Sequence, residues 1–155
     1  MTPFLVPLDA DALRAADIPA PWSYGFSDRV RFGEIDVLGH VNNAAYLRWF
    51  ENLRINYFQD YGLFDYATKP PKLVLRSLGL SFHREVKMND PYILTGRTVE
   101  MRASSFTMNY GVWVNGQLTT TGDAVIVSLN NDNSKRPLTD DLKNSLRDRD
   151  GAVQA

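Results

Sequence analysis

Residues 31–43 combine side chains at a spacing that suits acyl chemistry. The segment reads Arg-Phe-Gly-Glu-Ile-Asp-Val-Leu-Gly-His-Val-Asn-Asn, and its carboxylate at Asp36 precedes a glycine, Gly39, by three positions. Asparagine is a favoured residue just before a helix, so Asn42 and Asn43 predict a helix start. The first amides of a helix have no partner inside it and lie at the positive end of its dipole. An oxygen that gains negative charge during a reaction is stabilised there.

Hydrolysis of an activated acyl group needs this set of groups. One group attacks the carbonyl carbon or activates a water molecule, and fixed donors hold the developing oxyanion. Asp36 would supply the carboxylate, Gly39 would let a substrate come close to the backbone, and His40 would orient Asp36 or the substrate. On spacing alone, the commoner case is that Asp36 only closes a turn and His40 packs in a loop.

The flanking segments predict the elements that would position this turn. Residues 24–32 alternate loosely between apolar and polar and predict a strand. Residues 43–60 predict a long helix with apolar side chains on most sides, which is typical of a helix enclosed by other structure, and Gly62 is a plausible end residue. The later patterns predict four consecutive strands, at residues 72–84, 92–102, 105–114 and 117–130. One long helix followed by such strands favours an α+β fold with an antiparallel sheet around the helix.

The length of 155 residues favours one domain. We expect an N-terminal arm at 1–21 with a short Ala-rich helix, a single domain at 22–147 and a frayed tail at 148–155. The connector at 60–71 is apolar for a loop, so it either packs under the sheet or covers an acyl pocket. His83 is expected on the sheet surface or at an interface rather than in catalysis.

Composition excludes several classes of function. The formal net charge is −1 and the basic residues do not cluster with aromatic ones, which disfavours a nucleic-acid partner. The absence of cysteine excludes a disulfide framework, a thiolate zinc site and a cysteine nucleophile. No signal peptide and no membrane span are expected from the sequence. A reducing compartment, the cytoplasm, fits this composition.

The run from Val30 to Arg54 resembles the hot-dog-fold acyl-CoA thioesterases of the 4-hydroxybenzoyl-CoA thioesterase type. The form His-Val-Asn-Asn at residues 40–43 is similar to the branch that acts on fatty acyl groups. Two positions depart from the family pattern: Glu34 stands where many relatives have Asp, and only Arg102 remains of a basic run. The residues that support the resemblance are Phe32, Glu34, Asp36, Gly39, His40, Val41, Asn42, Asn43, Tyr46, Trp49, Phe50 and Arg54.

The resemblance implies a hot-dog fold, with a long central helix wrapped by a curved antiparallel sheet. It implies an acyl-CoA thioesterase without metal or other cofactor, acting on acyl-CoA or on acyl carrier protein, and a homodimer or homotetramer. Nucleophile and general-base roles for Asp36 stay open, as do chain length and aryl or alkyl preference. The site residues that follow are Asp36, His40 and Asn43 for catalysis and Gly39, Asn42, Tyr46 and Arg102 for substrate binding.

Two other functions remain open at this point. The first is a hot-dog hydratase or dehydratase, which also binds acyl thioesters at a helix end. The second is a module that binds acyl thioesters without turning them over. Release of a free thiol would separate hydrolysis from both.

Overall fold

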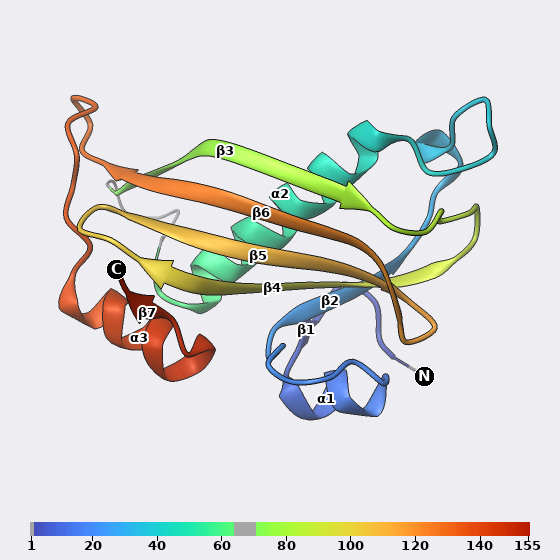
Figure 1. Cartoon of the computed structure of the whole chain (residues 1–155), viewed down its shortest axis with the longest axis horizontal. Helices are drawn as coiled ribbons and strands as arrows, with labels where there is room; N and C mark the ends of the chain where they lie inside the picture. Colours follow the sequence, from blue (N-terminus) through green and yellow to red (C-terminus); the bar gives the residue numbers. More distant parts are fainter. Residues whose placement is uncertain (1, 64–70) are drawn as a thin grey trace.

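The computed structural model describes residues 2–63 and 71–155 (Figure 1). A 3₁₀ turn at Phe32–Glu34 and three helices accompany the strands. In chain order the elements are β1 (Pro7–Leu8), α1 (Ala10–Ala15), β2 (Gly25–Arg29), the 3₁₀ turn, α2 (Asn43–Asp60), β3 (Lys72–Phe82), β4 (Pro91–Met101), β5 (Ser105–Val114), β6 (Gln117–Leu129), α3 (Asp140–Asp150) and β7 (Val153–Gln154).

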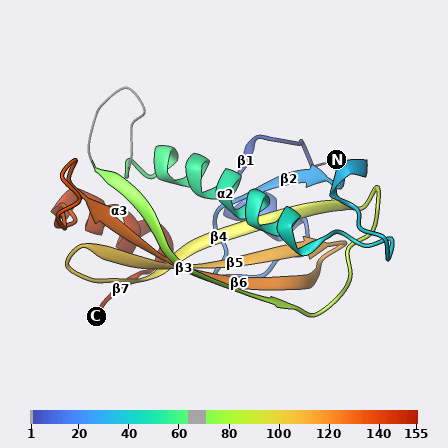
Figure 2. The same cartoon turned by 90° about the horizontal axis from the view of Figure 1, so that it is seen from above.

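The strands of the described residues form one seven-stranded sheet in the order β1-β2-β4-β5-β6-β3. Neighbours on this path are antiparallel, and β7 adds in parallel to β4. Helix α2 lies along one face of the sheet (Figures 1 and 2). Val112 packs in the cluster around α2 and the next residue, Trp113, in the cluster with Leu13 of α1, so the two helices cover opposite faces. This confirms the expected α+β hot-dog fold.

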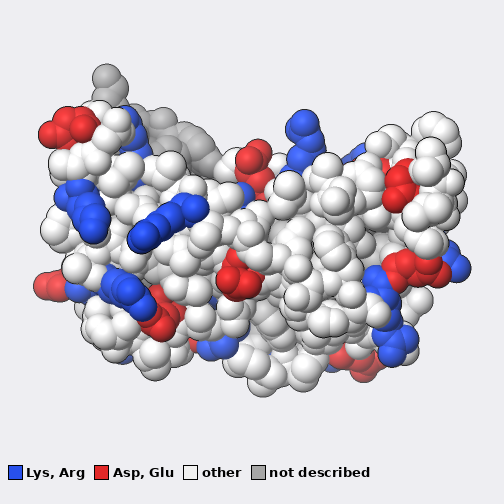
Figure 3. Space-filling model, turned by 45° about the horizontal axis from the view of Figure 1, so that its top comes forward, with Lys and Arg blue, Asp and Glu red and all other residues white. Residues whose placement is uncertain are grey.

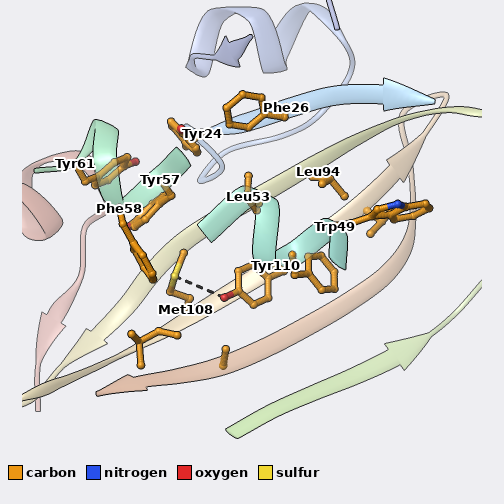
Figure 4. Close-up of a cluster of buried hydrophobic side chains, with 14 of the residues drawn as sticks. Tyr24, Phe26, Trp49, Leu53, Tyr57, Phe58, Tyr61, Leu94, Met108 and Tyr110 are labelled. Carbon is orange, nitrogen blue, oxygen red and sulfur yellow. Dashed lines mark hydrogen bonds between the residues drawn. The ribbon is translucent and has the colours of Figure 1, made fainter. Parts of the chain in front are cut away.

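Helix α2 is fixed to the sheet by a row of large side chains. Phe50, Leu53 and Tyr57 are at most 1% exposed, and their neighbours in the cluster come from the strands below (Figure 4). A Cβ atom on Gly96 of β4 would lie 2.8 Å from the Leu53 side chain, so the missing side chain lets the helix approach the sheet. Each such side chain contributes about 1.5–3 kcal/mol to folding.

A buried carboxylate anchors the far end of α2. Asp150 accepts hydrogen bonds from the Tyr57 hydroxyl, from the Tyr61 hydroxyl at 2.6 Å and from the Thr98 amide at 2.7 Å. The Arg97 guanidinium donates to the Asp150 carbonyl at 2.7 Å. These bonds hold α3 against α2 and β4.

Most sequence-derived boundaries are confirmed, with two differences. The helix at 43–60 matches α2, whereas the first strand stops at Arg29 because the chain enters the 3₁₀ turn. The frayed tail expected at 148–155 is wrong: α3 runs to Asp150, which is buried, and β7 pairs with β4. Phe64 and Tyr66 of the suggested acyl-pocket cover lie outside the described residues.

Buried phenols make the stability of the fold sensitive to alkaline pH. Burial raises the pKa of Tyr24, Tyr57, Tyr61 and Tyr92 far above the usual value of 10. Above pH 10 the unfolded chain therefore loses protons that the folded chain keeps, and stability falls. We expect the free energy of unfolding, measured by urea denaturation, to drop above pH 10, with a limiting slope of at most about 1.4 kcal/mol per pH unit for each tyrosine that stays protonated in the folded chain.

Tyr57→Phe removes one of these groups. Its slope above pH 10 should be shallower than that of the parent by about one tyrosine's share, although its stability at neutral pH is lower. A parent protein with equal stability at pH 9 and pH 11 would contradict the burial of the phenols.

Candidate active site

The turn between the 3₁₀ segment and α2 is closed by its own backbone. The Asn42 amide donates to the Glu34 carbonyl at 2.8 Å, and Ile35 pairs with Val41 as an isolated antiparallel bridge. Between them, the Asp36 amide donates to the His40 carbonyl at 2.9 Å. Residues 36–40 therefore form a loop whose two ends are tied together directly in front of the helix.

The carboxylate of Asp36 holds this loop from inside. Its Oδ1 atom accepts from the Leu38 amide at 2.9 Å and from the His40 amide at 3.3 Å. Gly39 has φ +81°, a left-handed conformation that other residues rarely adopt, and its amide donates to the Asp36 carbonyl at 3.1 Å. Within the described residues the second carboxylate oxygen accepts no hydrogen bond, so it is available to a water molecule or a substrate.

The start of α2 offers two amides. Asn42 is the N-cap, and its side-chain oxygen accepts from the Ala45 amide at 3.1 Å. The amides of Asn43 and Ala44 have no acceptor among the described residues. A developing oxyanion placed there would meet two donors and the positive end of the helix dipole.

A cavity of about 470 Å³ joins these two features. Asp36 and Asn43 line one side of it, and the end of β3 with the following residues lines the other. The connection after β3 reaches the turn because the Val41 amide donates to the Val86 carbonyl at 2.9 Å. The complete lining is Asp36, His40, Val41, Asn43, Tyr46, Phe82, His83, Arg84 and Glu85.

His40 and Glu85 both line the cavity and contact each other directly. Its Nε2 atom pairs with the Glu85 carboxylate, whose other oxygen lies 3.5 Å from Lys87 Nζ. The His40 backbone, rather than its ring, is what binds Asp36. Glu85 therefore orients the imidazole at the edge of the site.

Tyr46 forms part of the apolar wall. Its ring lies 5.1 Å from that of Phe82 and 4.9 Å from that of Trp49. Burial raises the pKa of Tyr46, so its hydroxyl keeps its proton at neutral pH.

The face shown in Figure 3 carries scattered Lys and Arg side chains among Asp and Glu, with broad uncharged areas between them.

The structure brings together all but one of the residues predicted for the site. Asp36, His40, Asn43 and Tyr46 line the cavity. Asn42 and Gly39 belong to the turn beside it. Arg102 instead follows the other end of β4, where it pairs with Glu100 at 3.0 Å. Arg102 is not among the residues that line the cavity. An eleven-residue strand spans roughly 35 Å, so the length of β4 separates Arg102 from residues near its first end, and the expected contact with the site is not made within one chain.

Sequence reasoning missed the groups that come from the end of β3. His83, expected on the sheet surface or at an interface rather than in catalysis, is exposed and lines the cavity, where its Nε2 atom lies 3.0 Å from the Thr121 hydroxyl. Glu85 and Phe82 were not considered. They are more than 35 positions from the turn in the sequence, so only the sheet topology could place them.

Comparisons with known proteins identify the relatives of this chain. A family model described as "Thioesterase-like superfamily" matches residues 30–146. A crystal structure of a thioesterase superfamily protein from Jannaschia sp. CCS1 is 41% identical, with a TM-score of 0.95 over 100% of both chains. A thioesterase from Thermus thermophilus, complexed with coenzyme A and Zn, is 31% identical, with a TM-score of 0.72 over 82% of this chain and 94% of that one. The uncharacterised protein YsmA of Bacillus subtilis strain 168 is 30% identical over 80% of this chain and 86% of its own length.

Two features are absent from the described residues. None of their helices has the length and apolar character needed to cross a membrane. In the same residues, no three His, Asp or Glu side chains are grouped so that they could hold a metal ion.

The geometry of the helix start predicts different effects for its two asparagines. Asn42→Ala removes the side-chain acceptor of the Ala45 amide and should lower the free energy of unfolding by about 0.5–2 kcal/mol. The Asn43 side chain is exposed, so Asn43→Ala should cost less than half as much. Urea denaturation of the two variants measures the difference. A larger loss for Asn43→Ala would mean that the helix is capped by that residue instead.

Proposed function

Since the chain belongs to the thioesterase-like superfamily, we propose that it hydrolyses an acyl thioester to a free carboxylic acid and a thiol. The observation that supports this function most is the shared cavity at the start of α2. Asp36, whose second carboxylate oxygen accepts no hydrogen bond in the described residues, and the N-terminal residue of the helix, Asn43, line the same cavity. A carboxylate and a pair of amide donors are the two parts that attack on an acyl carbonyl requires.

The reaction assigns a role to each of these groups. Water adds to the carbonyl carbon, and Asp36 takes its proton; alternatively the carboxylate itself attacks, and water then cleaves the resulting anhydride. The carbonyl oxygen becomes an oxyanion and accepts hydrogen bonds from the amides of Asn43 and Ala44. Collapse of the intermediate breaks the carbon–sulfur bond, and the departing thiolate takes up a proton. His40, which lines the cavity and is oriented by Glu85, would supply that proton.

Coenzyme A is the thiol carrier that we propose. The support comes from the Thermus thermophilus relative, which was crystallised with coenzyme A, and from the resemblance of residues 30–54 to the 4-hydroxybenzoyl-CoA type. Gly39 and Tyr46 then flank the thioester, since one lies in the turn and the other on the wall of the cavity. Acyl carrier protein remains the alternative carrier.

We further propose that two copies of the chain pair along β3. This strand is hydrogen-bonded to β6 on one side, and within the described residues no strand covers its other side. Val74, Leu75 and Phe82 on it expose 41–52% of their surface. A free edge with exposed apolar side chains invites pairing with a second edge. Because β3 also ends at the cavity, such pairing would bring the partner next to the site.

The assignment of Asp36 predicts the behaviour of an isosteric variant. Asp36→Asn keeps the oxygen that accepts from the Leu38 and His40 amides but removes the charge. Thiol release from a panel of acyl-CoA substrates, followed with a thiol-trapping reagent, should fall by about 10²–10⁴. The melting temperature should change little, because the turn keeps its bonds.

Asp148→Asn is the matched control. Asp148 is an exposed carboxylate on α3, at the other end of the molecule from the turn (Figure 1), and its variant should keep parental turnover. Parental turnover in Asp36→Asn would disprove the catalytic assignment. A parent that binds acyl-CoA and releases no thiol would point to the hydratase or to the non-catalytic binding module.

The proposed pairing along β3 predicts the mass in solution. Light scattering at micromolar concentration should give at least twice the 17.6 kDa of one chain. Leu75→Lys places a charge on the exposed edge and should shift the protein towards one chain. A parent that runs as a single chain would rule the pairing out.

A further inference from the structure

Glu34 accepts hydrogen bonds from several segments around the site, and none of the roles described above accounts for these bonds. Its Oε2 atom accepts from the Arg31 amide at 3.0 Å, and its Oε1 atom accepts from the Trp49 indole N–H at 3.1 Å. Its carbonyl accepts from the Asn42 amide at 2.8 Å and from the Asn42 side chain at 3.3 Å. One residue thus joins the 3₁₀ turn, the helix cap and the second turn of α2.

The indole at the end of this connection is held firmly by the core. Trp49 is 3% exposed, and its ring stacks on Tyr92 at 4.0 Å with an angle of 21° between the planes. A buried indole N–H needs an acceptor, and Glu34 is the one that it has. The carboxylate of Glu34 is therefore fixed to a group that cannot move without disturbing the sheet.

The turn that carries Asp36 is attached to Glu34 at both of its ends. Asp36 follows it by two residues, and Asn42, which caps the oxyanion helix, is bonded to its carbonyl. Any shift of Glu34 would change the position of Asp36 relative to the amides of Asn43 and Ala44. An error of about 1 Å in such a pair can cost 10²-fold in rate.

We propose that Glu34 is a positioning residue of the active site, which sets the distance between Asp36 and the start of α2 through its bond to Trp49. This role rests on the proposed thioesterase function but needs no contact between Glu34 and the substrate. It also explains why a longer side chain than aspartate suits this position: the carboxylate has to reach an indole in the second turn of the helix.

The test combines three variants with the matched control Glu51→Ala, which alters an exposed glutamate on the same helix. Glu34→Ala removes both acceptors, and Glu34→Gln keeps only one of them. Trp49→Phe keeps an aromatic ring on Tyr92 and removes the N–H donor. We expect kcat to fall by about 10–100-fold in Glu34→Ala, with KM changed by less than about threefold. The kcat values of Glu34→Gln and Trp49→Phe should lie between those of the parent and Glu34→Ala.

The double variant Glu34→Ala/Trp49→Phe decides whether the two residues act together. If they do, its kcat should be no lower than that of Glu34→Ala alone, since the bond is already lost. The proposal is overturned if the loss of kcat in the double variant equals the product of the two single losses. A parental kcat in Glu34→Ala, or a rise in KM without any loss of kcat, would overturn it as well. If Glu34→Ala does not fold, the same comparison is made between Glu34→Gln and Trp49→Phe.

Hydrogen exchange supplies a readout that does not depend on turnover. The amides of Leu38 and His40 donate to Asp36, and that of Asn42 donates to Glu34. We expect their exchange to become at least about tenfold faster in Glu34→Ala and to stay unchanged in Glu51→Ala. Unchanged exchange would overturn the positioning role even if the parent hydrolyses thioesters. Faster exchange in Glu34→Ala, together with a parent that shows no hydrolase activity, would keep the positioning role and reject the proposed function.

Discussion

The packing of α2 against the sheet is the constraint on which the site depends. Phe50, Leu53 and Tyr57 are buried against β4 and its neighbours, and Gly96 lets the helix come close. An apolar contact of this size fixes the helix in translation and in rotation about its axis. The unpaired amides at its first turn then point in one direction. Their usefulness as an oxyanion site follows from the rigidity of the element that presents them.

Because the turn in front of the helix is hydrogen-bonded to the helix start, it holds the Asp36 carboxylate in a defined position. Asp36 uses one oxygen to hold the turn together and leaves the other free. A carboxylate bonded in this way cannot rotate freely, so little reorganisation is needed before it acts on a bound substrate. The same bonds that would be read as a simple turn closure are those that orient the charge. In the proposed reaction, the structural and chemical roles of Asp36 are thus not alternatives.

Features that depend on residues close together in the chain could be predicted from the sequence, whereas features that depend on contacts between distant segments could not. The bounds of α2 at Asn43 and Asp60 depend on local capping and periodicity, and they were predicted correctly. Asp36, His40 and Asn43 were predicted to lie together because they are neighbours in the chain. His83 and Glu85 reach the cavity only because the end of β3 folds back beside the turn. Arg102 follows the end of β4 and pairs with Glu100 rather than lining the cavity, because a family pattern gives no distance along a strand. The buried tail at Asp150 was missed because its partners, Tyr57 and Thr98, lie in other elements.

The two ends of α2 differ in how fully their polar groups are hydrogen-bonded, and this difference explains how the fold can carry unpaired amides at the start of the helix. At the C-terminal end, Asp150 satisfies the hydroxyls of Tyr57 and Tyr61, and Arg149 lies 3.7 Å above the Tyr61 ring. At the N-terminal end, the amides of Asn43 and Ala44 stay without an acceptor in the described chain. Unpaired groups reduce stability when they are buried, but Asn43 and Ala44 are exposed, so water can reach them. The densely bonded end keeps the helix in place, and in the proposed reaction the opposite end would present these donors to the substrate.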